Sequence, residues 1–384
     1  MSKYNFDEIV NRRNTHSAKW DVKENELPMW VADMDFHVLP EIKEIISKRN
    51  EIDAYGYMHC PEEYFEAYKN WWGKRHNVDI DIKDMTFCTG VVAAIDSIFK
   101  HLLPKGSGVV VMTPVYHIFF NCIRNNGLRQ LDNQLVYKDH NYTINFEGLE
   151  KLLSNQNTSC LLLCNPHNPV GRLWNEDEIK EIIRLCEKHN VLLVSDEIHC
   201  DIVELGHEYN SVLKYSGNAI ALWSVTKAFN VAGIQCSVIA CKNHDLMQRI
   251  EEGVGQDDVG EANYFSPFVA IEALTHGEEW ILEVNKYIFN NKNYFKAFIE
   301  EHLSKASLID NKATYLLWLD ISQYGLTSKE FADILRQETG LFVSPGSQFG
   351  NGGEGFLRIN IATSLANVKD ACERLEKYVK TLQK

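Results

Sequence analysis

One lysine follows a short apolar run in a way that suits covalent chemistry. Residues 219–223 predict a buried strand, and the chain then continues through Ser224 and Thr226 to Lys227. A lysine at the mouth of a buried strand is poorly solvated, so its amine loses a proton more easily and can attack a carbonyl carbon. Taken alone, the segment also fits a strand that ends in a polar turn with a solvated lysine. The residues that follow the other predicted strands decide between these interpretations.

Three further strand ends carry residues that could bind a flat, anionic ligand. Gly90 opens a helix, where free backbone N–H groups and the helix dipole favour an anion. Tyr116 could stack on a ring. Asn168 lies in residues 165–171, whose two Asn-Pro pairs hold an amide rigidly at the sheet edge. An ordinary helix start and a core tyrosine are the alternatives for the first two.

An acidic residue and a histidine follow another buried run, residues 191–195. An unpaired carboxylate at Asp196 would be costly, and a protonated pyridine nitrogen would be a suitable partner for it. His199 could orient or donate a hydrogen bond. The alternatives are a helix N-cap and a core histidine. A metal site that adds Cys200 and Asp201 to this pair is also possible, but no second group of ligands supports it.

An arginine lies in the segment 355–360, near the end of the chain. Strand alternation places Arg358 on the face opposite Leu357 and Ile359. Its guanidinium fork suits a substrate carboxylate, whereas the alternative is a surface salt bridge.

Together these strand ends supply the contacts of one cofactor, pyridoxal 5′-phosphate. The ring nitrogen is assigned to Asp196, the 3′-oxygen to Asn168 and the aldehyde to Lys227. The phosphate is assigned to the backbone amides of the helix that Gly90 opens and to the hydroxyls beside the lysine. The predicted cofactor-binding residues are Gly90, Val91, Val92, Tyr116, Asn168, Asp196, His199, Ser224, Thr226 and Lys227.

The elements that position these residues alternate between apolar runs and helical patterns. Continuous apolar runs between helices indicate strands that are covered on both faces, as in a mostly parallel α/β sheet. The runs are residues 108–112, 159–164, 191–195, 219–223 and 236–240. After about residue 285, short strands mixed with helices predict a smaller α+β domain.

We therefore expect three parts of the chain. Residues 1–40 are an N-terminal segment that packs with the small domain. Residues 41–285 form the large cofactor-binding domain, and residues 286–384 form the small C-terminal domain.

The composition excludes several classes of partner. The chain has 384 residues and a formal net charge of −14, so phosphates of nucleic acids and of membrane surfaces repel it. The start of the chain is polar, which argues against a signal peptide, and we find no apolar run long enough to span a bilayer. Ten cysteines without a CxxC pair indicate reduced core residues in a cytoplasmic protein.

Several segments resemble a known family, the fold-type I pyridoxal-phosphate enzymes of aminotransferase class I/II. Within it, the chain is similar to the MalY/PatB-type cystathionine β-lyase branch, a group of cysteine C–S lyases. The resemblance extends over almost the whole chain. The matching segments are residues 19–21, 28–36, 55–57, 165–171, 196–199, 227–235 and 355–360.

The resemblance implies a large domain with a mostly parallel mixed sheet, a smaller α+β domain, and a homodimer with active sites at the subunit interface. Tyr57 would reach the cofactor or substrate of the other subunit. Lys227, Tyr116 and Tyr57 are the implied catalytic residues, and Arg358, Tyr57 and Asn168 the implied substrate-binding residues. The branch usually has serine where Thr226 stands, so the phosphate contacts of this chain differ in detail.

The implied activity is an α,β-elimination on cystathionine, cysteine or a related cysteine S-conjugate, which gives a thiol, pyruvate and ammonia. The amino-acid substrate is a small molecule. An aminotransferase of the same family is the alternative, because it would share every residue named above. A regulatory binding protein with a side lyase activity is a lesser alternative.

Overall fold

The computed structural model describes residues 3–8 and 10–382. The remaining residues of the predicted terminal segments, 1–2, 9 and 383–384, lie outside the described residues. The helices are α1 (Pro40–Asn50), α2 (Glu62–His76), α3 (Val91–Leu102), α4 (Ile118–Asn125), α5 (Phe146–Leu153), α6 (Glu176–Lys188), α7 (His244–Gln256), α8 (Ser266–His276), α9 (Glu278–His302), α10 (Ser328–Thr339) and α11 (Leu365–Thr381).

The strands belong to two main sheets and two short ladders. They are β1 (Leu27–Pro28), β2 (Met85–Cys88), β3 (Gly108–Val111), β4 (Arg129–Asp132), β5 (Val136–Lys138), β6 (Asn141–Thr143), β7 (Thr158–Cys164), β8 (Leu192–Asp196), β9 (Ile220–Trp223), β10 (Ser237–Ala240), β11 (Ser307–Leu308), β12 (Leu316–Asp320), β13 (Leu341–Phe342), β14 (Ser344–Pro345) and β15 (Phe356–Asn360).

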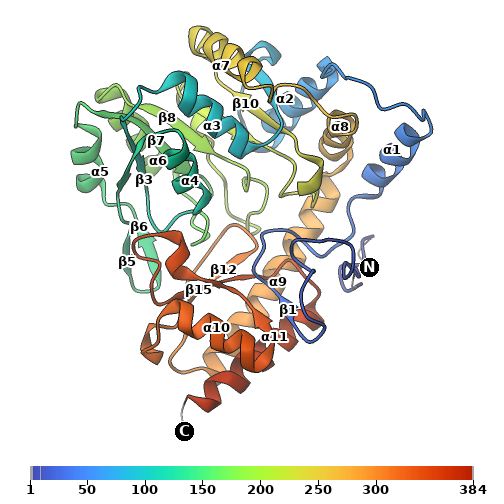
Figure 1. Ribbon diagram of the computed structural model, residues 1–384, viewed down its shortest axis with the longest axis vertical. Coiled ribbons are helices and arrows are strands. Elements are labelled where there is room, and N and C mark those ends of the chain that lie inside the picture. Colours follow the sequence, from blue (N-terminus) through green and yellow to red (C-terminus); the bar gives the residue numbers. More distant parts are fainter. Residues whose placement is uncertain (1–2, 9, 383–384) are drawn as a thin grey trace.

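The larger sheet has seven strands in the order β2-β10-β9-β8-β7-β3-β4. The strands from β9 to β4 pair in parallel, and β10 is antiparallel to both of its neighbours. Helices flank the sheet, and β3, β9 and β10 are buried along their whole length (Figure 1). The predicted mostly parallel α/β sheet is confirmed.

The register of this sheet aligns the carboxyl ends of its central strands. Cys164 at the end of β7 pairs with Asp196 at the end of β8, and Asp196 pairs in turn with Leu222 of β9. The segments that follow these three strands therefore leave the same edge of the sheet side by side, which is where ligands bind in open α/β sheets.

Local sequence signals account for the main helices around this sheet. Asn175 and Glu178 form the predicted capping box of α6, with their side chains bonded to each other's backbone N–H groups. In α2, the aromatic stripe packs into the core, since Tyr64, Tyr68 and Trp72 are almost fully buried.

The smaller sheet has four antiparallel strands in the order β11-β12-β15-β14. The 25-residue helix α9 leads from the large sheet toward it (Figure 1). The N-terminal segment also reaches this part of the chain, because β1 pairs in parallel with β13. The division at residues 40 and 285 remains a prediction.

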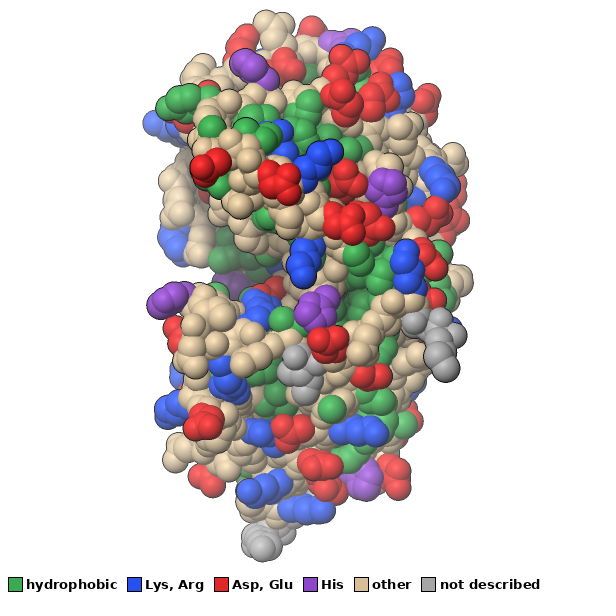
Figure 2. Space-filling model, turned by 90° about the vertical axis from the view of Figure 1, so that its right-hand side faces the viewer, with side chains coloured by type: hydrophobic (Ala, Val, Ile, Leu, Met, Phe, Trp, Pro, Cys, Tyr) green, Lys and Arg blue, Asp and Glu red, His purple; other side chains and the backbone are tan. Residues whose placement is uncertain are grey.

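The surface carries charges of both signs. The face in Figure 2 shows acidic and basic side chains interspersed, and a hollow at mid-height between its two halves. None of the described helices combines the length and the apolar character that a bilayer crossing requires. All ten cysteines have free thiols, and only Cys60 is not buried.

Candidate active site

A cavity of about 390 Å³ lies at the carboxyl edge of the seven-stranded sheet. It is enclosed by the segments that follow β2, β3, β7, β8 and β9 together with part of the N-terminal segment. The predicted residues that line it are Gly90, Val91, Val92, Tyr116, Asn168, Asp196, His199, Thr226 and Lys227. Residues from five separate strand ends thus meet in one place.

Three predicted residues lie outside the cavity wall. The Ser224 hydroxyl donates to the Cys236 carbonyl over 2.7 Å and lies 2.7 Å from the Thr226 hydroxyl, so it supports Thr226 from behind. Arg358 lies next to the cavity and bonds to Asn168. The Tyr57 side chain is fully exposed and makes no contact with the cavity of its own chain.

Lys227 and Asp196 lie in this cavity as buried titratable groups. Burial lowers the pKa of Lys227 to about 8, and Arg358 acts in the same direction, while Asp33 and Asp196 oppose it. Burial also raises the pKa of Asp196 to about 7, because its carboxylate accepts only the backbone N–H of Ile198 within the described residues. An amine that is easily deprotonated and a carboxylate without a cationic hydrogen-bond partner therefore face the same space.

Arg358 is a buried cation that has no acidic partner among the described residues. Its side chain is 4% exposed, and burial lowers its pKa to about 10. One Nη donates to Asn168 Oδ1 over 3.2 Å and the other to the Trp30 carbonyl over 2.8 Å, whereas Nε is buried without a partner. A buried guanidinium in this state favours an anionic ligand such as a carboxylate.

The opposite end of the cavity offers backbone donors. Gly90 precedes α3 without a side-chain cap, so the first N–H groups of the helix, at Val91 and Val92, remain available at the cavity wall. The helix dipole favours an anion at this position. The Thr226 hydroxyl lies at the same cavity and adds a further possible donor.

These features fit pyridoxal 5′-phosphate. The cavity offers an anion site at the start of α3, a buried carboxylate for a protonated ring nitrogen, and a lysine for the aldehyde. His199 lines the same cavity, and burial lowers its pKa to about 3, so it is a neutral hydrogen-bonding group there. Its Nδ1 is buried without a partner, which leaves a polar atom for a ligand to satisfy.

Two hydrogen bonds to the Ala32 carbonyl, beside Lys227, were not predicted from the sequence. The Lys227 amine donates to the Ala32 carbonyl over 2.6 Å, and the Tyr315 hydroxyl donates to the same oxygen over 3.0 Å. A backbone carbonyl carries no sequence signal, and Tyr315 stands at the start of an apolar run that indicates only a strand.

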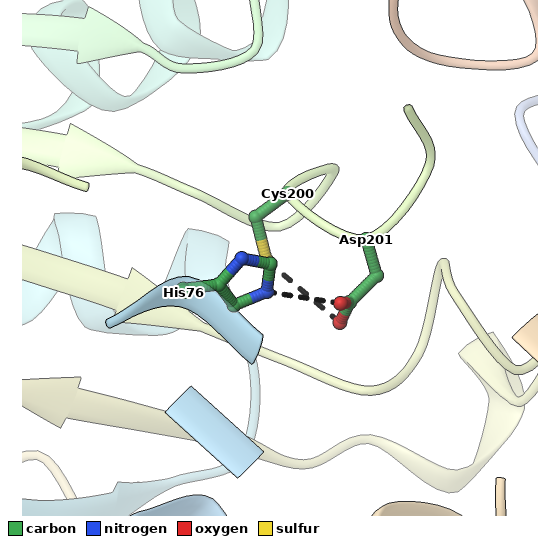
Figure 3. Close-up of side chains that lie close together, drawn as sticks. All are labelled: His76, Cys200 and Asp201. Carbon is green, nitrogen blue, oxygen red and sulfur yellow. Dashed lines mark hydrogen bonds and ion pairs between the residues drawn. The ribbon is translucent and has the colours of Figure 1, made fainter. Parts of the chain in front are cut away.

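A second cluster of possible ligands lies behind the cavity. Figure 3 shows the side chains of His76, Cys200 and Asp201 pointing toward one another. However, the Asp201 carboxylate already accepts hydrogen bonds from Trp71, Arg75 and His76. Burial acts to raise the pKa of Asp201, but His76 and Arg75 outweigh it and hold this pKa below its ordinary value.

The cluster is therefore a structural crosslink between α2 and the loop that carries His199. The Arg75 guanidinium supplies the cation that this carboxylate needs. Asp196 and His199 face the cavity instead, so the described residues do not bring the four candidate metal ligands of the sequence together.

Comparison with known proteins gives the same family along nearly the whole chain. The family model for aminotransferase class I and II matches residues 24–375. Cystathionine beta-lyase PatB of Bacillus subtilis (strain 168) is 34% identical over 383 residues, which cover 97% of this chain and 99% of that protein.

Two solved structures are similar in fold and sequence. Cystalysin from Treponema denticola, which contains pyridoxal 5′-phosphate, has a TM-score of 0.95 and 32% identity, covering 99% of both chains. The pyridoxal-phosphate-bound C–S lyase from Staphylococcus hominis has a TM-score of 0.91 and 30% identity, covering 97% of both chains. The predicted family, fold class and cofactor are confirmed.

The first prediction concerns the Lys227 amine in the apoprotein. Only the neutral amine attacks an aldehyde, and burial shifts its pKa from 10.5 to about 8. The rate constant for recombination with pyridoxal phosphate should rise with pH and level off above about pH 8. Stopped-flow absorbance of the bound cofactor measures this rate. A midpoint near 10.5 would contradict the environment described for Lys227.

The second prediction concerns the crosslink at Asp201. Replacing Asp201 with alanine leaves Arg75 and His76 without their buried partner, so the free energy of unfolding should fall by about 3–5 kcal/mol. Chemical denaturation measures it. Lys74→Ala, which removes an exposed ion pair with Glu278, is the control and should cost about 1 kcal/mol or less. Stabilisation of the parent by added Zn²⁺ that is absent in Asp201→Ala would instead indicate a metal site.

Proposed function

This chain belongs to the aminotransferase class I and II family, and we propose that it is a pyridoxal-phosphate-dependent carbon–sulfur lyase. It cleaves cystathionine, cysteine or a related cysteine S-conjugate to a thiol, pyruvate and ammonia. The observation that carries the proposal is that one cavity holds Lys227, with its lowered pKa, and the buried carboxylate of Asp196. The 34% identity to cystathionine beta-lyase PatB over both chains supports the choice of reaction.

Lys227 has two roles in this reaction. When bound, the cofactor is held covalently by Lys227 and withdraws electrons from the Cα of the substrate. Once the substrate amine has displaced it, the Lys227 amine is free and removes the Cα proton at Nζ as a general base. A pKa of about 8 suits this role, because a substantial part of the amine is then neutral near pH 7–8.

Arg358 and Asn168 bind and orient the substrate. The Arg358 guanidinium binds the α-carboxylate through donors that have no acidic partner among the described residues. Asn168 Oδ1 accepts from Arg358, which fixes both the amide and the guanidinium. The carboxylate is thereby anchored, and rotation about the Cα bonds is restricted, so the Cα–H bond can point toward Lys227.

Asp196 and Tyr116 set the environment of the cofactor ring. The Asp196 carboxylate would hold the protonated ring nitrogen, and the negative charge would keep that nitrogen protonated. Tyr116 lines the cavity and would supply an aromatic face for the ring. Val91, Val92 and Thr226 bind the phosphate.

The active protein is a homodimer in this proposal, with Tyr57 completing the site of the partner subunit. Ile52, Tyr55 and Tyr57 are 57%, 56% and 100% exposed, within a run of exposed residues that follows α1. In Figure 1 this connection extends along the outer edge of the molecule. Three large apolar or aromatic side chains so close together are typical of a protein interface. The ten free cysteines support a cytoplasmic location.

The third prediction tests the role of Lys227. Lys227→Ala should lower the rate of pyruvate formation from cystathionine by about 10³-fold or more, since both the covalent anchor and the base are lost. Lactate dehydrogenase coupling and a thiol reagent follow the two products. Lys242→Ala, which removes a lysine bonded to the Leu213 carbonyl, is the matched control. Parental rates in Lys227→Ala, or amino transfer to keto acids without release of thiol, would reject the lyase assignment.

The fourth prediction tests whether Tyr57 acts across a dimer. Tyr57→Ala and Lys227→Ala homodimers should each be nearly inactive. When the two variants are unfolded together and refolded at equal amounts, random pairing gives about a quarter of the sites a native Lys227 and a native Tyr57. The mixture should then regain about a quarter of the parental activity. No gain on mixing would show that Tyr57 does not act in the partner's site.

A further inference from the structure

The backbone carbonyl of Ala32 holds the Lys227 amine in a specific place. It accepts the Lys227 Nζ over 2.6 Å and the Tyr315 hydroxyl over 3.0 Å. The Tyr315 side chain is fully buried, and its ring packs edge-on against His199 with ring centroids 5.9 Å apart. The carbonyl, the amine and the hydroxyl thus form one bonded group beside the cavity.

The segment around Ala32 is fixed from both sides. The Asn360 amide donates to the carbonyls of Val31 and Asp33, each over 2.6 Å. On the other side, Asn230 accepts from the Met34 N–H and donates to the Phe36 carbonyl. These bonds flank Ala32 closely, so its carbonyl cannot move away from the lysine without breaking them.

Next to Ala32, the Asp33 carboxylate supplies negative charge. Its Oδ2 accepts from Arg12 over 2.7 Å, and Lys19 lies 3.7 Å from Oδ1. Oδ1 is buried and has no hydrogen-bond partner within the described residues. Among the nearby charges, Asp33 contributes most to raising the pKa of Lys227 and so favours its protonated form.

We propose that the Ala32 carbonyl and the Asp33 carboxylate form a receiving site for the Lys227 amine in the steps in which that amine is not bound to the cofactor. Tyr315 and Asp33 are then positioning residues that act through Lys227. The inference rests on the proposed function, since only a lysine that is released and becomes protonated needs such a site.

The physical need arises when the lysine is set free. A free amine gains N–H donors, and an ammonium group has three of them. A buried donor without an acceptor costs about 1–3 kcal/mol or more, so a protonated Lys227 needs acceptors inside the cavity wall. The Ala32 carbonyl provides one, and the Asp33 charge stabilises the ammonium form without contact with the substrate.

Other titratable and charged groups also lie around Lys227. The titratable and charged side chains that surround it are Asp33, Tyr116, Asp196, His199, Tyr315 and Arg358. The effect of the Asp33 charge can be distinguished from the effect of its ion pair with Arg12. Replacing Arg12 breaks the ion pair but leaves the carboxylate in place.

The fifth prediction uses this pair of variants in the apoprotein. Asp33→Asn should shift the midpoint of the pH dependence of recombination with pyridoxal phosphate down by about half a pH unit or more, because a charge that favours the ammonium is lost. Arg12→Gln breaks the same Arg12–Asp33 bond but keeps the carboxylate, so its midpoint should stay at or above the parental value. An unchanged or raised midpoint in Asp33→Asn, or a downward shift in both variants, would overturn the proposal.

Tyr315→Phe provides an independent measurement in the holoenzyme. Loss of the hydroxyl removes the second donor to the Ala32 carbonyl and so changes how this oxygen is shared with the Lys227 amine; kcat for pyruvate formation should fall by about tenfold while KM stays within about twofold. The matched control is Tyr64→Phe, which removes another buried hydroxyl that donates to a backbone carbonyl, that of Ser237. A parental kcat in Tyr315→Phe, or an equal loss in Tyr64→Phe, would also reject the proposal.

The two measurements separate this inference from the proposed function. The apoprotein titration requires only cofactor binding, so it remains informative even if cysteine conjugates are not the substrates. Conversely, lyase activity with no difference between Asp33→Asn and Arg12→Gln would leave the proposed function intact and remove the receiving site.

Discussion

The burial of charge at one edge of the seven-stranded sheet is the constraint on which the site depends. Lys227, Asp196 and Arg358 are all removed from water there, yet none of them forms an ion pair with another described side chain at close range. Such charges are tolerated only where ligands supply their partners or where the surrounding backbone supplies hydrogen bonds. The cofactor and the substrate carboxylate would supply the charged partners, and the backbone of the N-terminal segment supplies hydrogen bonds. The buried charged groups of the cavity therefore lack partners that the cofactor and the substrate would supply.

The surrounding structure keeps these groups in place at some distance from the chemistry. The Asp201 crosslink ties α2 to the loop after β8, and Glu197 in the same loop accepts hydrogen bonds from Ser195, Ser211 and the Trp223 indole. Asp196 and His199 lie in the same short stretch as these two buried acids. Residues 196–201 thus have two roles. Asp196 and His199 face the cavity, whereas Glu197 and Asp201 form hydrogen bonds within the core.

The sequence allowed most of the cavity wall to be predicted, since the predicted wall residues lie in segments that follow strands and the parallel register brings those strand ends together. The antiparallel direction of β10 could not be derived, because an apolar run has no direction. Ala32 and Tyr315 were also missed. The Lys227–Ala32 and Tyr315–Ala32 hydrogen bonds join residues 195 and 283 positions apart, and both depend on a carbonyl that every residue has. Likewise, Ser224 and Thr226 look equivalent along the chain, but only Thr226 lines the cavity.

The N-terminal segment has a consequence for the order in which the molecule is assembled. The carbonyls of Val31 and Asp33 accept hydrogen bonds from Asn360, which lies 329 and 327 positions further along the chain. Contacts between residues so far apart in the sequence form slowly, because a long loop must close first. Lys227 cannot acquire its full environment until the chain has been synthesised beyond Asn360. A chain that ends before Asn360 would therefore lack the bonds that flank Ala32, whose carbonyl accepts the Lys227 amine.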